Sequence, residues 1–375
     1  MSNGMTPCFI PNLPVMVLLA IVYLIAGKLG LLLAFVNPSA TAVWAPTGIA
    51  LAATLMFGYR VWPGVMVGAF LVNVTTTGSI VTSLGIAAGN TLEGLAGAYL
   101  VTRFAHGRYA FERPKDIFKF ALLAGILSTM VAATVGVTSL ALAGFANWTD
   151  YGSIWFTWWL GDAMGAFMVA PLLVLWFRNP RIQWQRSRAL EVGLLLVCLV
   201  VVGQVVFGGW IPATAKDYPL DYLCVPLLMW AAFRFGQRET ATAALVLSGI
   251  ALWGTLRGFG PFVRDTQNES LLLLQTFLGI TALLAMAFAA VVSERRQVEA
   301  KREELLGDLQ EALARIKILR GLLPICGGCK KIRNDQGCWD HVETYIRMHS
   351  EAAFTHTVCP DCLDRLYPRY ANASH

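Results

Sequence analysis

The chain has 375 residues, of which 56% are hydrophobic and 14% are charged, and its mean hydropathy is +0.58. An average soluble domain has about 25% charged residues, so this composition excludes a disordered chain and argues against an ordinary soluble enzyme. The net charge of +6 does not indicate nucleic-acid binding, because the basic residues lie between apolar runs and form no stripe interleaved with aromatic side chains. The 82 residues from Glu294 onward hold 25 of the 52 charged residues. We therefore predict an all-α polytopic membrane part followed by a short water-soluble tail.

After a short N-terminal tail (residues 1–12), the predicted membrane domain covers residues 13–293. A helix needs about 20 apolar residues to span a bilayer. Ten candidate spans cover 13–35, 43–57, 62–74, 80–102, 117–143, 154–177, 189–209, 220–235, 239–255 and 270–293. The second and third are short, and if they form a re-entrant pair the count is eight. The first run is too long for the core of a signal peptide and no basic region precedes it, so we expect no cleavable signal.

The charges of the loops predict an orientation. If the tail is cytoplasmic, ten spans place twelve Lys and Arg residues in inner loops and three in outer loops, namely Lys216, Arg257 and Arg264. This distribution obeys the positive-inside bias. We therefore expect a multi-pass protein in the lipid bilayer with its C-terminus in the cytoplasm.

Three charged residues lie inside the predicted spans: Lys28, Glu93 and Asp162. Such charges are costly in a bilayer, at about 2.5–3.5 kcal/mol each, and often mark functional sites. Lys28 and Asp162 both lie about 10–12 Å from the outer ends of their spans at the helical rise, so they are candidates for an ion pair or for the wall of one cavity. The alternatives are that Lys28 snorkels outward and that the two acids are structural hydrogen-bonding groups.

Helix breakers also recur within the spans. Trp44 and Pro46 open the second span, Pro171 interrupts the sixth and Pro226 interrupts the eighth. Membranes tolerate such breaks where neighbouring groups or cavity water satisfy the freed backbone. These residues are therefore candidate walls of a ligand site, although simple kinking of the helices explains them equally well.

Two stretches of the chain echo each other. The stretch 46–60 and the stretch 226–238 each contain a proline-bearing span that ends in Gly-x-Arg at a predicted inner loop. Because both copies have the same orientation, the echo is consistent with a parallel internal repeat.

Three ordered blocks of these residues resemble a known family. The residues in question are Val43-Trp44-Ala45-Pro46-Thr47-Gly48 with Gly58-Tyr59-Arg60-Val61-Trp62-Pro63-Gly64, then Trp159-Leu160-Gly161-Asp162-Ala163-Met164-Gly165 with Ala170-Pro171-Leu172, and finally the run from Pro226 to Gly236. They are similar to the membrane-associated sensor domain (MASE, type one) over roughly residues 13–293. The resemblance implies a sensory module of the bacterial inner (plasma) membrane, usually fused to a histidine kinase or a diguanylate cyclase, whose ligands are mostly undefined.

Residues 294–323 form a predicted signalling linker. The seam positions are spaced 3, 4, 3, 4 and 3 apart and consist of Leu306, Leu309, Leu313, Ile316, Arg320 and Leu323. This spacing is typical of the a and d positions of a coiled coil. We predict a parallel homodimer through a helix that continues the last span. The alternative is a single amphipathic helix packed on the tail.

The tail, residues 324–375, contains two Cys-x-x-Cys pairs. Cys326 with Cys329 and Cys359 with Cys362 can supply the four thiolates of a tetrahedral Zn²⁺ shell. A reducing cytoplasm disfavours structural disulfides, and a small module with little core folds more readily around a metal. A thioredoxin-like redox pair and an iron–sulfur cluster or another metal are the alternatives.

We expect a strand pair and a helix over 339–349 between the two cysteine pairs, giving a small α+β, zinc-finger-like fold. The segment also resembles a small C-terminal domain of bacterial sensor and response-regulator proteins, whose role is poorly defined. In that resemblance Cys338 stands where an aromatic residue is usual, which argues against Cys338 as a required ligand.

The sequence carries no phosphoacceptor-histidine helix, cyclase signature or Walker loop. We therefore predict a non-catalytic sensory protein that relays a signal through the linker to the metal-binding tail and on to a separate cytoplasmic signalling protein. The alternatives are a transporter or channel with a metal-responsive cytosolic gate, and an assembly scaffold whose tail recruits partners.

Overall fold

The structure, a computed structural model, describes residues 13–32, 34–37, 40–41, 43–77, 79–181, 186–210, 219–315 and 323–366. It divides into two compact units, Met1–Gln297 and Val298–His375, which are described separately. The helices of the first unit are α1 (Leu13–Leu31), α2 (Ala45–Phe57), α3 (Trp62–Thr77), α4 (Ile80–Phe104), α5 (Pro114–Phe120), α6 (Thr129–Leu142), α7 (Tyr151–Arg178), α8 (Arg186–Phe207), α9 (Cys224–Arg234), α10 (Gln237–Leu256) and the start of α11 (Gln267–Arg315).

Each predicted span contains a helix, but the first is shorter than predicted: α1 ends at Leu31, and its predicted end lies in the strand β1 (Ala34–Asn37), which pairs antiparallel with β2 (Ala40–Thr41). Within the described residues, six helical stretches are long and apolar enough to cross a membrane: Leu13–Leu31, Pro114–Leu142, Trp148–Arg178, Arg186–Phe207, Gln237–Leu256 and Gln267–Leu313. The helices α2, α3 and α9 have 13, 16 and 11 residues, fewer than the roughly 20 that a span needs. The fold is therefore a polytopic helical membrane protein, as the sequence predicts.

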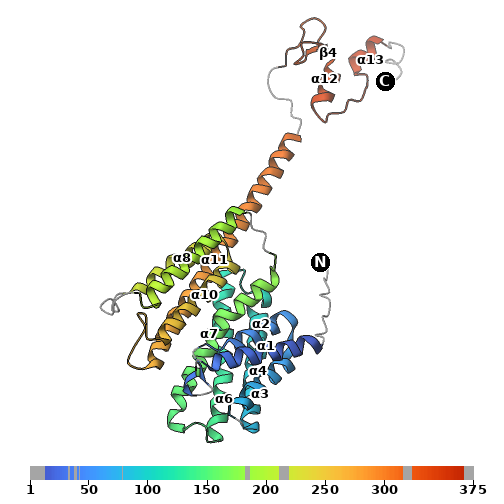
Figure 1. The fold of residues 1–375 in the computed structure, drawn as a ribbon. Helices are drawn as coiled ribbons and strands as arrows, with labels where there is room; N and C mark the ends of the chain where they lie inside the picture. Colours follow the sequence, from blue (N-terminus) through green and yellow to red (C-terminus); the bar gives the residue numbers. More distant parts are fainter. Residues whose placement is uncertain are drawn as a thin grey trace. The chain divides into compact units, whose positions relative to one another are not determined.

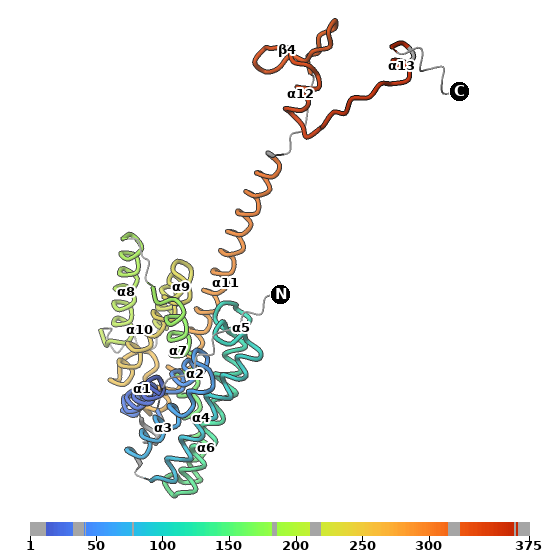
Figure 2. The backbone as a smooth tube through the Cα atoms, turned by 90° about the vertical axis from the view of Figure 1, so that its right-hand side faces the viewer, coloured from blue at the N-terminus to red at the C-terminus, as the bar shows by residue number. Residues whose placement is uncertain are grey.

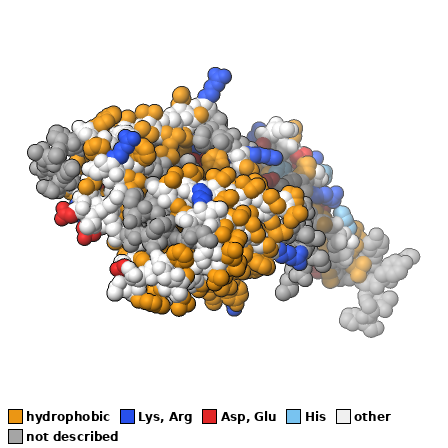
Figure 3. Space-filling view, turned by 60° about the horizontal axis from the view of Figure 1, so that its bottom comes forward, with side chains coloured by type: hydrophobic (Ala, Val, Ile, Leu, Met, Phe, Trp, Pro, Cys, Tyr) orange, Lys and Arg blue, Asp and Glu red, His pale blue; other side chains and the backbone are white. Residues whose placement is uncertain are grey.

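Apolar side chains cover the outside of the first unit as well as its interior. Leu18, Ile25 and Leu29 of α1 are 62%, 55% and 60% exposed, and Leu190 and Val197 of α8 are exposed to a similar degree. Figure 3 shows hydrophobic side chains spread over the viewed face, with few charged groups among them. Such a surface is too apolar for water and fits contact with lipid tails.

The helices form two neighbouring groups. The helices α1 to α7 pack together, α8, α9 and α10 pack against one another, and α10 joins the groups by packing on α7 (Figure 1). Figure 2 shows the same grouping from a second side. The core of the second group includes Met164 and Met168 of α7 together with residues of α8 to α11, so α7 belongs to both groups.

Glycines allow the closest approaches between helices. A Cβ atom at Gly48 of α2 would lie 2.3 Å from the carbonyl oxygen of Gly165 in α7, and one at Gly165 would lie 2.0 Å from the carbonyl oxygen of Trp44. No side chain fits at either position, so the two backbones are in direct contact. Between α1 and α3, Gly64 likewise lies against the backbone of Met16. Small residues serve this purpose in membranes, where packing replaces the hydrophobic driving force.

The predicted inner loops lie on one face of the first unit. The contacts that join them are Arg178 with the Arg108 carbonyl and with Glu112, Arg238 with the carbonyls of Asn179 and Arg181, Arg188 with the Phe235 carbonyl, and Arg296 with the Phe233 carbonyl. The ends of α2 and α7 also meet there, because the rings of Phe57 and Phe177 pack edge to face. This clustering is what the alternation of the predicted spans requires.

The two echoing stretches have the same local structure. Pro46 lies in the first turn of α2 and Pro226 in the first turn of α9, where a proline breaks no helical hydrogen bond. Gly58 and Gly236 then leave these helices with φ angles of +84° and +121°, which glycine adopts readily. Pro226 lies within the predicted eighth span, as the third residue of α9, directly after the 3-10 helix Leu220–Leu223.

The second unit contains the end of α11 and a small α+β tail. The strands β3 (Ile332–Arg333) and β4 (Trp339–Asp340) pair antiparallel, followed by α12 (Val342–His349) and α13 (Pro360–Leu366). The predicted strand pair is confirmed. The predicted helix starts later than residue 339, because Trp339 and Asp340 pair with β3. Among the described residues of this unit, the buried hydrophobic side chains are Ile332 and Tyr345.

The α2–α7 contact yields a stability prediction. We expect Gly165→Ala to destabilise the protein by about 1–3 kcal/mol, because the added methyl group forces the two backbones apart. Gly152→Ala in the same helix is the matched control, since a Cβ there meets nothing within 4 Å. Thermal unfolding in detergent measures both variants. Equal unfolding temperatures for the two would contradict the close contact.

Candidate functional site

The start of α2 is fixed to the middle of α7 by backbone contacts. The amide of Trp44 donates a hydrogen bond to the carbonyl of Gly161 (2.9 Å). One turn further along each helix, Gly48 and Gly165 are in contact. Thr47 lies between these two contacts, next to Gly48, so its side chain is held over α7.

Thr47 bridges two buried acids from two other helices. Its hydroxyl Oγ1 lies 2.9 Å from Oδ1 of Asp162 in α7 and 3.4 Å from Oε2 of Glu93 in α4. Asp162 is fully buried, Glu93 is 2% exposed and Thr47 is 5% exposed. We call Thr47, Glu93 and Asp162 the acid cluster. It joins the helices α2, α4 and α7 through buried polar side chains.

Further polar groups surround the acid cluster. Tyr23 of α1 is 1% exposed, and its hydroxyl lies beside the side chains of Trp44 and Asn90. It is also close enough to Glu93 and Asp162 to interact with their charges. The indole of Trp158 lies beside Asp162. By distance and angle, Nε1 of Trp44 and both amide atoms of Asn90 make no hydrogen bond within the described part of the chain. The site thus contains buried donors and acceptors that have no hydrogen-bond partner within the described residues.

A count of hydrogen bonds indicates what the acid cluster can bind. A threonine hydroxyl has a single proton, and a carboxylate accepts but does not donate. The short contact uses that proton for Asp162, so Glu93 receives none from Thr47. In addition, Oε1 of Glu93 and Oδ2 of Asp162 have no hydrogen-bond partner among the described residues. The cluster therefore has acceptor capacity for a proton, a cation or the donor groups of a ligand.

The structure does not form the predicted pair between Lys28 and Asp162. The ammonium group of Lys28 donates to the hydroxyl of Thr76 in α3 (2.8 Å), whereas Asp162 bonds to Thr47. The prediction is wrong because similar depth in the membrane does not place two residues on facing sides of their helices. Lys28 lies where the ends of α1 and α3 meet, outside the acid cluster.

The helix breakers fall into different environments. Trp44 and Pro46 are buried at the start of α2, next to the acid cluster. Pro171 is buried inside α7, which continues past it to Arg178 without ending. Pro226 is exposed in the first turn of α9. Of the four breakers, the first two therefore border the candidate site and Pro226 does not.

Each cysteine pair of the tail forms a tight turn. The amide of Cys326 donates to the carbonyl of Lys331 (2.8 Å), and the amide of Lys330 donates back to the carbonyl of Cys326 (3.0 Å). Cys359 directly precedes α13, whose Leu363 amide bonds to its carbonyl (2.9 Å).

Hydrogen bonds within each turn favour thiolates. The backbone amide of Cys329 lowers the pKa of the Cys326 thiol, and the backbone amide of Cys362 lowers the pKa of the Cys359 thiol. The structure does not bring the two pairs together: the described residues contain no group of three or more Cys, His, Asp or Glu side chains that could hold one metal ion.

Sequence reasoning missed three residues of the site: Thr47, Tyr23 and Asn90. It considered charged residues and helix breakers, and a hydroxyl or amide is too common in membrane helices to stand out. One signal was present, because Asn90 precedes Glu93 by three residues and shares its helix face.

One protein family matches most of the chain. The model of the family described as MASE1 matches residues 15–296, about three quarters of the chain. No curated protein and no solved structure matches the chain. The matched region contains every residue of the acid cluster and the two glycines that bring α2 onto α7. The chain thus belongs to the MASE1 family of membrane sensor domains.

Proposed function

We propose that the protein is a non-catalytic sensor of the bacterial inner membrane that perceives a ligand or a membrane state at the acid cluster. The observation that carries this proposal is the convergence of the sensor-family motifs on one buried polar site. The Trp-Ala-Pro-Thr-Gly block supplies Thr47 and the Trp-Leu-Gly-Asp block supplies Asp162. Acidic side chains inside a membrane cost free energy and usually have a functional role. Recognition of a ligand or a membrane state would be such a role.

A signal at the cluster has a route to the last membrane helix. Ala166 and Ala170 of α7 share a core with Met286 and Ala290 of α11, and Gly279 of α11 lies against Met164 of α7. A ligand that prefers one position of α2 and α7 shifts the balance between two states of the bundle. Movement of α7 then changes its packing against α11, which continues into the linker.

The proposed output begins with a homodimer through the linker. Leu306, Leu309 and Leu313 are 47%, 55% and 59% exposed on α11. They lie at a and d spacing, so a second copy of the chain would cover them in a parallel coiled coil. The exposure argues against the alternative in which this face packs on the tail. Two further seam residues, Ile316 and Arg320, lie outside the described residues.

The tail is proposed to bind Zn²⁺ through Cys326, Cys329, Cys359 and Cys362. Their turns and lowered thiol pKa values suit half-shells of a tetrahedral site. Since the described core of this unit is so small, the bound ion would supply much of its stability. In the proposed ten-span topology the tail is cytoplasmic, where it would contact a separate signalling protein.

Two observations favour a second function, a transporter or channel with a metal-responsive cytosolic gate. The acid cluster has unpaired acceptors, and the repeated local structure at Pro46–Gly58 and Pro226–Gly236 resembles the internal repeats of transporters. Under this reading the acids carry a cation across the bilayer instead of reporting its presence.

The sensor proposal predicts coupling between the cluster and the linker. A benzophenone side chain placed at Leu309 should crosslink two chains in vesicles, whereas one placed at Glu311, on the opposite face of the helix, should not. We expect Asp162→Asn to change the crosslinking yield at Leu309 by about twofold or more, because it removes an acceptor of the acid cluster and shifts the balance of states. The exposed Asp150→Asn in the same region is the control. An unchanged yield in Asp162→Asn would count against the sensor.

Ion flux separates the sensor from the transporter. We expect vesicles that contain the purified protein to show no flux of H⁺ or Na⁺ above that of protein-free vesicles, as followed with a pH-sensitive dye and a sodium tracer. A flux that Asp162→Asn abolishes and Asp150→Asn preserves would instead establish transport.

The metal proposal predicts one zinc ion per full-length chain purified in detergent. We expect Cys326→Ser and Cys359→Ser each to lose the ion, because three thiolates hold zinc far more weakly than four. Cys338→Ser should keep it, since this cysteine lies in the β3–β4 turn. Elemental analysis gives the stoichiometry, and proteolysis of the tail reports its folding. Zinc retained by both Cys326→Ser and Cys359→Ser would refute the assignment.

A further inference from the structure

A polar cavity of about 420 Å³ lies where four helices end or begin on the arginine-rich face of the first unit. It is lined by the end of α7, Arg181, Arg188 of α8, the turn from Phe235 to Glu239 between α9 and α10, and Ser293 of α11. A cavity of this size falls within the range of roughly 300–1,000 Å³ that small-molecule sites occupy. It lies at the C-terminal end of α7, whereas the acid cluster lies at the middle of that helix, so the sensor proposal does not use it.

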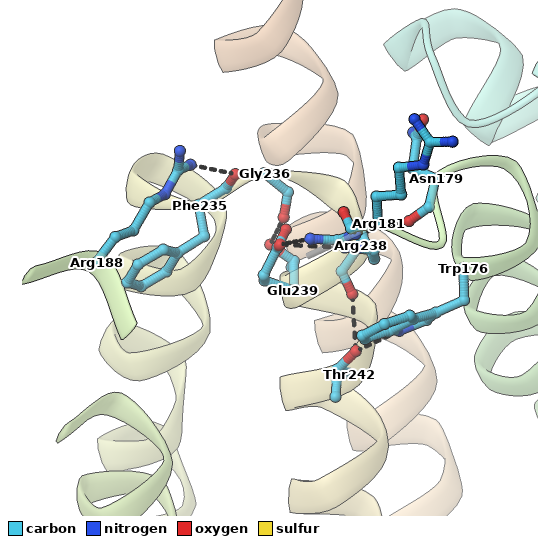
Figure 4. Close-up of polar contacts among 10 residues, drawn as sticks. Trp176, Asn179, Arg181, Arg188, Phe235, Gly236, Arg238, Glu239 and Thr242 are labelled. Carbon is cyan, nitrogen blue, oxygen red and sulfur yellow. Dashed lines mark hydrogen bonds and ion pairs between the residues drawn. The ribbon is translucent and has the colours of Figure 1, made fainter. Parts of the chain in front are cut away.

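Arg238 forms a fixed part of the cavity wall. Its guanidinium pairs with Glu239 (2.6 Å) and donates to the carbonyls of Asn179 and Arg181 (2.6 and 3.2 Å). The same group lies 4.8 Å from the ring centre of Trp176, and Figure 4 shows it between Glu239 and Asn179. The side chains of Arg238 and Glu239 are 13% and 12% exposed. Their charges cancel, so this pair shapes the wall without adding net charge.

Two further guanidinium groups are not balanced in this way. Arg188 donates a single bond of 3.3 Å, to the carbonyl of Phe235 (Figure 4). The nearest acid on its helix, Glu191, is held by Arg234 through both oxygens (2.7 and 2.9 Å). The side chain of Arg181 makes no hydrogen bond within the described part of the chain. The cavity thus has two surplus positive charges, which Figure 4 shows on opposite sides of Gly236.

We propose that this cavity binds a phosphate group. Guanidinium groups bind phosphate through paired, charge-assisted hydrogen bonds, and two of them match the charge of a phosphate. Gln237 and Ser293 also line the cavity, and both are neutral polar residues that can hydrogen-bond the polar part attached to the phosphate. Because the cavity lies at the helix ends of a membrane protein, the phosphate belongs either to an anionic lipid headgroup or to a soluble phosphate compound.

The test uses the full-length protein in an uncharged detergent. We expect phosphatidylglycerol to raise the unfolding temperature and to appear as a bound lipid in native mass spectrometry, whereas phosphatidylcholine, which has no net charge, does so much more weakly. In Arg181→Gln/Arg188→Gln this binding should weaken by about tenfold or more, because two charge-assisted contacts are lost. Arg257→Gln/Arg264→Gln, with the same change of charge in predicted outer loops, should bind as the wild type does. Arg181→Lys/Arg188→Lys should retain part of the binding.

Inorganic phosphate distinguishes the two sources. Displacement of phosphatidylglycerol by millimolar phosphate, or stabilisation by phosphate alone, would identify a soluble phosphate compound as the ligand. Lipid binding that phosphate does not affect would identify a headgroup. The proposal is overturned if neither probe binds, or if the Arg181→Gln/Arg188→Gln protein binds as well as the Arg257→Gln/Arg264→Gln control.

Discussion

The contact between the backbones of α2 and α7 at Gly48 and Gly165 is the constraint on which the candidate site depends. It places the carbonyl of Trp44 where any side chain at position 165 would lie, and the Trp44 amide bonds to Gly161 at the same junction. With the two helices held this closely, the short side chain of Thr47 reaches Asp162. A longer separation between α2 and α7 would leave Asp162 without this hydroxyl. The glycines of the family motifs therefore have a structural role and the threonine and aspartate a polar one.

The polar groups at this junction are costly where they lie. Buried donors and acceptors without partners lower stability by about 1–3 kcal/mol each, and the acid cluster and its neighbours contain several of them. Apolar side chains of similar shape at these positions would avoid this loss of stability. The same junction belongs to α7, which shares its core with both helical groups and with α11. A group that binds at the cluster is therefore placed to act on the helix that leads to the linker.

Much of the fold followed from hydropathy alone, because membrane helices satisfy their own backbone and leave long apolar runs. Glu93 and Asp162 were found from their charge. Their meeting at Thr47 was not, because hydropathy and depth do not say which way a residue faces around its helix. The pairing of Lys28 with Asp162 is wrong for the same reason, because depth does not show that Lys28 faces Thr76, to which it donates a hydrogen bond. In the tail, Trp339 was assigned to a helix because its neighbours have helical spacing, but pairing with Arg333 places it in β4.

The most direct test of this account is a double-mutant cycle between Thr47→Val and Asp162→Ala, read by thermal unfolding in detergent with Thr47→Ser as the conservative control. Residues that share a buried hydrogen bond have coupled effects on stability. We expect a coupling energy of about 1 kcal/mol or more, and near-wild-type stability for Thr47→Ser, which keeps the hydroxyl. Strictly additive effects of Thr47→Val and Asp162→Ala would contradict the account, since they would mean that α2 does not bring Thr47 onto Asp162.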